Sequence, residues 1–317
     1  MLTKQSSCIL LYDLVYYGNM KKIKLFCFPH SGGSASNFHA WKKYVDTHII
    51  DLHPMELPGR GKRFGEKFCL TMPEAMDDIY KKIKDDISKG PYAFFGHSVG
   101  SLLACELAHR IIKNGDNDPV HIFFSGHTPG DIEDTACFSD ERFKKFIQNH
   151  HLDENILLLT VNHTVVDNKK CFRSSDVEKV KNSHPDIYHA LSIKCSLPPD
   201  LEEDEFIREV NEIREANKDI FENKELRSLF LPILRADAGI CYNYRWSPKP
   251  SKLKSDITVL YGMGEENITT PDIEHWKDHT EKNCKIIPLR GGHFYFEENL
   301  KEIIAIINHT LSTYQSK

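Results

Sequence analysis

The sequence predicts an α/β fold with a mostly parallel central sheet flanked by helices, and three observations support this prediction. Short apolar runs of strand length alternate with segments whose apolar residues recur at helical spacing. Strands separated by helices need crossover connections, which make neighbouring strands parallel. The alternation breaks only once, between residues 131 and 234. With 317 residues, the chain can form one large domain that carries a sizeable insertion.

The first part of the chain contains four apolar runs that we predict to be strands. They lie at residues 24–28, 49–53, 92–95 and 120–124. Helices are expected between them at residues 38–44 and 72–87, and a third helix follows the strand at 92–95.

The chemically most informative stretch is Gly96-His97-Ser98-Val99-Gly100, which follows the third predicted strand and precedes a helical pattern. A sharp turn from strand to helix leaves little room for side chains, so glycines must flank the serine. Such a turn exposes the serine hydroxyl at the positive N-terminus of the following helix. We therefore predict that Ser98 is a nucleophile. The alternative is a chance occurrence of the pattern, which this structural context makes less frequent.

A glycine-rich loop, Pro29-His30-Ser31-Gly32-Gly33-Ser34, follows the first predicted strand. In hydrolases with a serine elbow, a loop at this place donates a backbone N–H to the developing oxyanion. We expect the donors to be the N–H groups of Ser31 and Val99. Taken alone the loop is an ordinary Gly-Gly turn, and only its combination with Ser98 favours the functional interpretation.

Residues 131–234 are charged and mostly helical in pattern, and the apolar run at 156–159 is ambiguous between strand and helix. A long insertion between two strands, at the end of the sheet where Ser98 is expected, predicts a lid over the site. The acidic run at 202–205 is interpreted as a solvated helix start.

After the lid, strands are predicted at residues 257–261 and 285–289 and a last helix at 300–311. The first of these strands ends before Glu265 and Glu266, and the second before His293. The order serine, acid, histidine, each after a strand, is that of the α/β-hydrolase arrangement. His293 is the predicted base.

Composition excludes several other functions. The net charge of −5 argues against general nucleic-acid binding. The nine cysteines form no CxxC pair or zinc-ligand spacing, so we expect reduced structural thiols and a cytoplasmic location. No run is long enough for a transmembrane helix, and residues 1–19 are a poor signal peptide. We expect them to be an N-terminal extension that folding and catalysis do not need.

Five segments of the chain resemble the type II thioesterases, stand-alone enzymes that serve polyketide and nonribosomal peptide synthases. Medium-chain fatty-acid thioesterases are close relatives of that family. The matching segments are residues 28–35 (FPHSGGSA), 56–63 (ELPGRGKR), 96–100 (GHSVG), 231–237 (LPILRAD) and 291–294 (GGHF). They stand in the family's order and cover about residues 21–150 and 217–310. The second and fourth segments together are strongly specific.

The chain departs from this family in two ways. The family's lid is much shorter, so about residues 155–212 are expected to be an insertion that affects substrate range. The family usually carries an aspartate after the penultimate strand, where this chain has Glu265 and Glu266. Glu265 is the predicted acid, with Glu266, Asp272 and Asp237 as alternatives, and Asp237 is otherwise expected to be a structural or lid-hinge residue.

The resemblance implies hydrolysis of an acyl thioester on the phosphopantetheine arm of an acyl carrier protein domain, or of acyl-CoA, without metal or cofactor. The implied domains are a core at residues 20–130 and 235–317 and a lid at 131–234. Two alternatives remain: a lipase- or esterase-like hydrolase of small oxyesters, and a non-catalytic binding module. His97, His30 and His127 are expected to be packing or pocket-lining residues.

Overall fold

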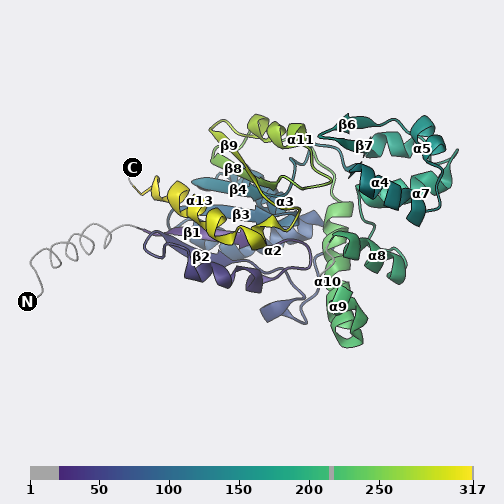
Figure 1. Ribbon diagram of the computed structural model, residues 1–317. Coiled ribbons are helices and arrows are strands. Elements are labelled where there is room, and N and C mark those ends of the chain that lie inside the picture. The colour runs from purple at the N-terminus through teal and green to yellow at the C-terminus, as the bar shows by residue number, and fades with distance from the viewer. Residues whose placement is uncertain (1–20, 214–217, 316–317) are drawn as a thin grey trace, which may run out of the picture.

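The computed structural model describes residues 21–213 and 218–315 and is organised around a six-stranded parallel sheet (Figure 1). The expected N-terminal extension, residues 1–19, lies outside the described residues. In spatial order the strands are β2 (Ile50–Pro54), β1 (Ile23–Phe28), β3 (Tyr92–His97), β4 (His121–Ser125), β8 (Asp256–Gly262) and β9 (Cys284–Leu289). All five neighbouring pairs are parallel, as the alternation of strands and helices predicts.

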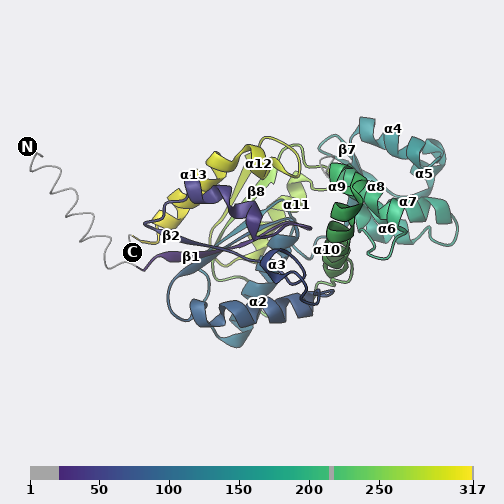
Figure 2. The same ribbon diagram turned by 90° about the horizontal axis from the view of Figure 1, so that it is seen from below.

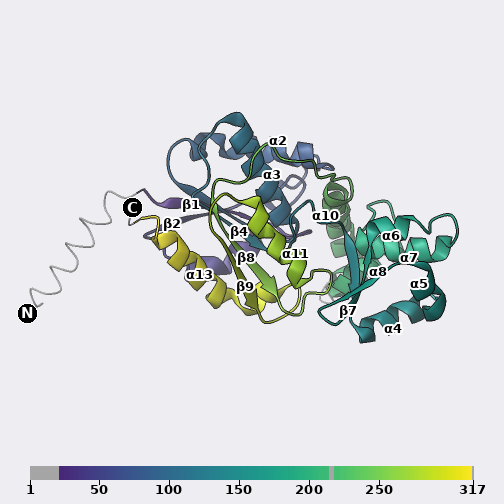
Figure 3. The ribbon, with the colours of Figure 1, turned by 90° about the horizontal axis from the view of Figure 1, so that it is seen from above.

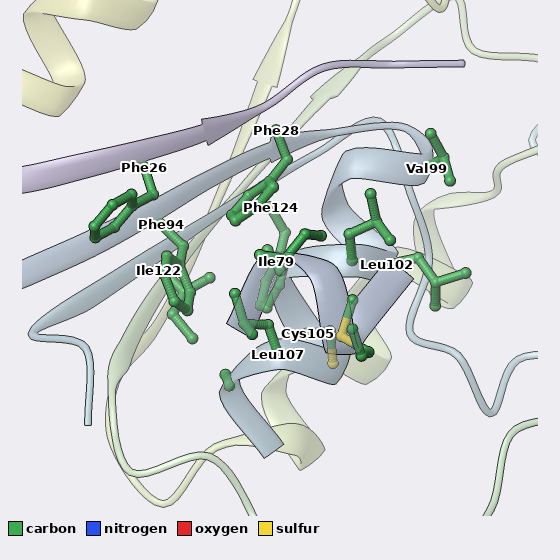
Figure 4. Close-up of a cluster of buried hydrophobic side chains, with 14 of the residues drawn as sticks. Phe26, Phe28, Ile79, Phe94, Val99, Leu102, Cys105, Leu107, Ile122 and Phe124 are labelled. Atoms are coloured by element: carbon green, nitrogen blue, oxygen red, sulfur yellow. The ribbon is translucent and has the colours of Figure 1, made fainter. Parts of the chain in front are cut away.

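Alternate side chains of the strands build two apolar layers, one on each face of the sheet. Phe26 and Phe94 point to the face covered by α2 (Met72–Ile87) and α3 (Val99–Asn114), where Figure 4 shows them with Ile79 and Leu107. The intervening side chains of the strands point to the opposite face, which α13 (Leu300–Ser312) covers with three buried isoleucines (Figure 2).

Local sequence signals set the ends of several elements. Thr71 and Glu74 form a reciprocal capping box at the start of α2, which begins and ends where the sequence predicts. The predicted helix at residues 38–44 is instead two short 3₁₀ turns, η1 (Ala35–Phe38) and η2 (Ala40–Lys43), which bury Phe38 and Trp41 against the sheet.

The lid projects from one end of the sheet as a second lobe (Figures 1 and 3). Its helices are α4 (Asp140–Asn149), α5 (Glu154–Thr160), α6 (Ser174–Glu178), α7 (Pro185–Cys195), α8 (Glu203–Ile213), α9 (Lys218–Glu222) and α10 (Lys224–Tyr242). The ambiguous run at 156–159 lies in α5, which Asp153 caps. α10 crosses the predicted limit between lid and core at residue 234, so the domain limits stay a prediction.

The lid also contains a three-stranded antiparallel sheet that the sequence did not predict. Its order is β5 (Thr135–Phe138), β7 (Lys169–Arg173) and β6 (Thr164–Val166). Phe138 and Phe172 pack with Phe143 of α4 in an apolar cluster that is separate from the core of the main sheet. This separate cluster lets the lid keep its own shape.

The expectation that all cysteines are reduced is wrong for one pair. Cys137 of β5 and Cys171 of β7 stand opposite each other in the lid sheet and form a disulfide. Strand pairing between distant segments creates this proximity, which sequence spacing could not show. Among the described residues, no helix combines the length and the apolar character needed to cross a membrane.

Candidate active site

Ser98 occupies a strained turn between β3 and α3. Its backbone φ of 56° lies in the left-handed region, which residues other than glycine rarely adopt. A Cβ at Gly96 would lie 2.1 Å from the carbonyl oxygen of Gly100, and a Cβ at Gly100 would lie 2.2 Å from that of Phe28. Both positions therefore require glycine, for the reason that the sequence motif suggested.

The structure brings Ser98, His293 and Glu265 into one hydrogen-bonded chain. The Ser98 hydroxyl lies 3.0 Å from Nε2 of His293. On the other side of the ring, Nδ1–H of His293 donates to Glu265, with distances of 2.9 Å to Oε1 and 3.1 Å to Oε2. Glu265 is only 4% exposed, so its carboxylate is shielded from competing water. This is the geometry of a nucleophile, a base and an orienting acid.

The other candidate acids lie in different contacts. Glu266 forms an ion pair with Arg142 of α4. Asp272, at the start of α11 (Thr270–Glu274), accepts a hydrogen bond of 2.5 Å from the Thr269 hydroxyl. Of the adjacent glutamates, it is Glu265 that contacts His293.

The surroundings of His293 set its protonation. Burial lowers the pKa of His293, but the charge and hydrogen bond of Glu265 outweigh burial and leave the pKa above its ordinary value. His97 packs beneath the ring, with centroids 5.2 Å apart, and burial holds the pKa of His97 well below its usual range. A neutral His97 adds no positive charge beside His293. Its Nδ1 lies 2.8 Å from the Ser125 hydroxyl, which fixes the ring.

Asp237 of α10 binds both the glycine-rich loop after β1 and the buried Arg60. Asp237 accepts two hydrogen bonds from the Arg60 guanidinium, at 2.6 and 2.7 Å, and a third from the N–H of Gly32 at 2.7 Å. Arg60 is 4% exposed and Asp237 1% exposed. Asp237 is therefore bound to Arg60 and Gly32 and anchors the loop that carries Ser31.

Two cavities meet at Ser98 and His293. The larger cavity has a volume of about 430 Å³. Its lining includes the polar side chains of Glu133, Arg142, Glu212 and His127. The smaller, of about 180 Å³, is mainly apolar. Its walls come from the glycine-rich loop after β1, α8 and α10, and include His30, Ser31, Phe206, Val210, Leu234 and Ala238. Ser31 thus lies beside Ser98, and Val99 is the first residue of α3.

His127 lines the larger cavity and His30 the smaller one, and both also have structural contacts. His30 lies 3.2 Å from Asn37 and packs edge-on against Phe294. Nδ1 of His127 lies 2.6 Å from the carbonyl oxygen of Thr128. Within residues 21–213 and 218–315, no cluster of three or more histidine, cysteine or acidic side chains could hold a metal ion.

Sequence reasoning missed the partners that hold the site in place. The buried Arg60–Asp237 pair joins residues 177 positions apart. Arg142 and Lys169 of the lid contact the loop that carries Glu265. Arg60 and Asp237 lie in two of the segments that carry the family resemblance, so the sequence did offer a signal for this pair. Nothing in the sequence pattern singled out the two lid cations.

A protein-family model and individual relatives match most of the chain. A model of the thioesterase domain family matches residues 23–164 and 189–311, and leaves residues 165–188 of the lid unmatched. The unmatched residues lie within the insertion expected at about 155–212. Most of the chain, including Ser98, Glu265 and His293, falls inside the matched stretches.

Individual relatives cover nearly the whole chain. The gramicidin S biosynthesis protein GrsT of Aneurinibacillus migulanus is 25% identical over 89% of this chain and 86% of its own length. The medium-chain S-acyl fatty acid synthase thioesterase of Homo sapiens is 28% identical over 92% of this chain and 88% of its own length. The crystal structure of ClbQ, from the colibactin NRPS/PKS pathway, superimposes with a TM-score of 0.68 at 25% identity, covering 92% of this chain and 98% of ClbQ.

Proposed function

The chain belongs to the thioesterase domain family, and from this premise we propose that it releases acyl chains from the phosphopantetheine arm of a carrier protein by hydrolysis. The observation that carries the proposal is the Ser98–His293–Glu265 chain, placed where two cavities meet. Relatives named for fatty acid synthesis, for gramicidin S biosynthesis and for an NRPS/PKS pathway support the carrier-bound substrate.

In the proposed reaction, His293 accepts the proton of Ser98 while the serine oxygen attacks the thioester carbonyl. The tetrahedral intermediate collapses, the C–S bond breaks, and His293 returns the proton to the leaving thiolate. Water then attacks the acyl-serine with His293 as base, the ester C–O bond breaks, and His293 returns the proton to the Ser98 oxygen as the free acid departs. Glu265 holds the imidazole in the productive tautomer and stabilises the imidazolium that forms twice in the cycle.

The oxyanion of both tetrahedral intermediates is assigned to the N–H groups of Ser31 and Val99. Each donor of this kind contributes about 3–4 kcal/mol of transition-state stabilisation. Asp237 supports this assignment because it binds the next N–H of the same loop, at Gly32, and so limits the loop's movement.

We place the acyl chain in the apolar cavity beside Ser98 and the more polar arm in the larger cavity. An apolar wall of Phe206, Val210 and Leu234 suits a hydrocarbon chain. Two of these three residues stand in the expected insertion. Replacing about residues 155–212 by a short linker should therefore change the preference for acyl length, and an unchanged acyl profile with undiminished stability would contradict this role.

The test of the proposed function is a panel of acyl-carrier and acyl-CoA thioesters of increasing length, beside matched oxyesters. We expect hydrolysis of the thioesters, with a preference for the carrier-bound form. High activity on oxyesters without preference for carrier-bound thioesters would favour a lipase- or esterase-like enzyme. Failure of a fluorophosphonate to label Ser98 would favour a binding module without activity.

The location of the protein is also a proposal. A cytoplasmic protein would meet its carrier partners directly, and the buried thiols of Cys27 and Cys105 would stay reduced there, whereas the Cys137–Cys171 disulfide would be unusual in that compartment. Cell fractionation tests this, together with thiol titration of the Cys137–Cys171 pair in the native protein. Recovery of the protein outside the cytoplasmic fraction would refute it.

A further inference from the structure

The lid contacts the acid loop, which we define as residues 263–269 between β8 and α11. This loop carries Glu265 and follows β8, the fifth strand in the order of the sheet. The contacting segment is the β6–β7 hairpin, residues 164–173, whose two strands lie beside α11 in Figure 1. The position of the acid relative to His293 therefore depends on two parts of the chain that are far apart in sequence.

One side chain makes the central contact. The Lys169 ammonium donates to the backbone carbonyl oxygen of Glu265, and also to that of Ile268 at 3.2 Å. Beside it, Asp167 accepts a hydrogen bond of 2.8 Å from the N–H of Thr270, where α11 begins. Lys169 is half-buried, so these hydrogen bonds face less competition from water than surface contacts do.

The hairpin is itself held firmly. β7 pairs with β5 through four residue pairs, and the Cys137–Cys171 disulfide joins the two strands two residues beyond Lys169. Most of the hairpin falls within residues 165–188, which the family model does not match. The contact with the acid loop is thus an addition of this chain to the family's common framework.

Glutamate has one more rotatable bond than aspartate, so the placement of its carboxylate depends more strongly on a fixed backbone. An ammonium that binds the carbonyl oxygens of residues 265 and 268 fixes the backbone on both sides of the intervening turn. We propose that Lys169 is a positioning residue for the reaction: it holds the acid loop so that Glu265 accepts the hydrogen bond of His293. This inference rests on the roles proposed above for Ser98, His293 and Glu265.

The first test compares Lys169→Met, which removes the ammonium at similar length, with Lys169→Arg, which keeps a donor. Lys170→Met is the matched control, because the neighbouring lysine binds Asp140 on the lid surface. We expect Lys169→Met to lower kcat roughly ten- to hundredfold with little change in KM, since Lys169 lines neither cavity. Lys169→Arg should recover most of the loss, and Lys170→Met should behave like the wild type.

The second test repeats Lys169→Met in a Glu265→Gln background and measures the rate of fluorophosphonate labelling at Ser98. If Lys169 acts through Glu265, its loss should matter little once the carboxylate is gone. An equal loss in both backgrounds, as a general folding defect would give, overturns the proposal, as does a wild-type kcat in Lys169→Met. Labelling does not depend on the acyl substrate, so a failure of the proposed thioester substrate is recognised separately.

Discussion

The buried ion pair between Arg60 and Asp237 provides the sharpest prediction on stability and activity together. Asp237→Ala removes the partner of a guanidinium that is only 4% exposed and has two hydrogen bonds to the carboxylate. Breaking a buried pair by deleting one member costs about 3–5 kcal/mol, because the remaining charge stays buried without compensation. A domain is typically stable by about 5–15 kcal/mol, so this single change removes a large share of the total.

The same substitution should also reduce turnover. The N–H of Gly32 loses its acceptor at 2.7 Å, and the loop that carries Ser31 is released from α10. Loss of one oxyanion donor lowers kcat by about 10²–10³ in serine hydrolases, which sets the upper limit of the expected effect. Asp237→Asn keeps an acceptor for Gly32 but not the charge. It should therefore retain more activity than Asp237→Ala at a similar loss of stability.

Urea unfolding and thioester turnover measure the two effects on the same samples. Asp78→Ala is the control, because Asp78 pairs with Arg63 nearby but is partly exposed, and Arg63 keeps Glu66 as a partner. We expect the free energy of unfolding of that variant to fall by about 1 kcal/mol or less. The double replacement Arg60→Met/Asp237→Leu should recover most of the stability but not the activity. If Asp237→Ala lowers the free energy of unfolding no more than the control variant does, the ion pair does not anchor the loop.

The remaining predictions concern the reacting groups and the N-terminus. Ser98→Ala and His293→Ala should each abolish nearly all turnover without unfolding the protein, and more than a tenth of wild-type activity in His293→Ala would exclude it as the base. Glu265→Gln should lower turnover by about 10⁴-fold and Glu266→Gln only slightly. The reverse result would identify Glu266 as the acid. Because the pKa of His293 is raised, the acid limb of the kcat/KM profile should lie above about pH 6.5. Removal of the Glu265 charge should move that limb to lower pH, and an unmoved limb would mean that another group sets it. A chain that starts at Met20 should fold and hydrolyse thioesters like the full chain, and an insoluble or inactive product would refute this.

The elements of the main sheet could be predicted because their signals are local. The strands β1, β3, β4 and β8 are runs of mostly buried residues, whereas the edge strands β2 and β9 are partly exposed. The start of α2 is marked by its capping box. The elbow at Ser98 was predictable for a similar reason, since only glycine fits at positions 96 and 100. The prediction of His293 as the base followed from the order of the strands alone.

Glu265 was the predicted acid, but local sequence could not exclude its neighbour Glu266. Glu265 and Glu266 follow the same strand, and a one-residue difference sends one carboxylate to His293 and the other to Arg142. The partner of the second lies 124 positions earlier in the chain, so its influence cannot be seen locally. The lid sheet was missed because its strands are short and β7 starts with two lysines, which weakens the apolar pattern that identifies a strand.

The two roles of α10 have a consequence for how the enzyme would select its substrate. Leu234 and Ala238 line the smaller, apolar cavity, and Asp237, which lies between them in the sequence, binds the glycine-rich loop that carries Ser31. An acyl chain too bulky for this cavity would push on the helical turn that holds the proposed oxyanion donor Ser31. We therefore expect selectivity to appear in the rate of the chemical step more than in the strength of binding. An acyl chain of the wrong size would bind, strain α10 and dissociate without being hydrolysed.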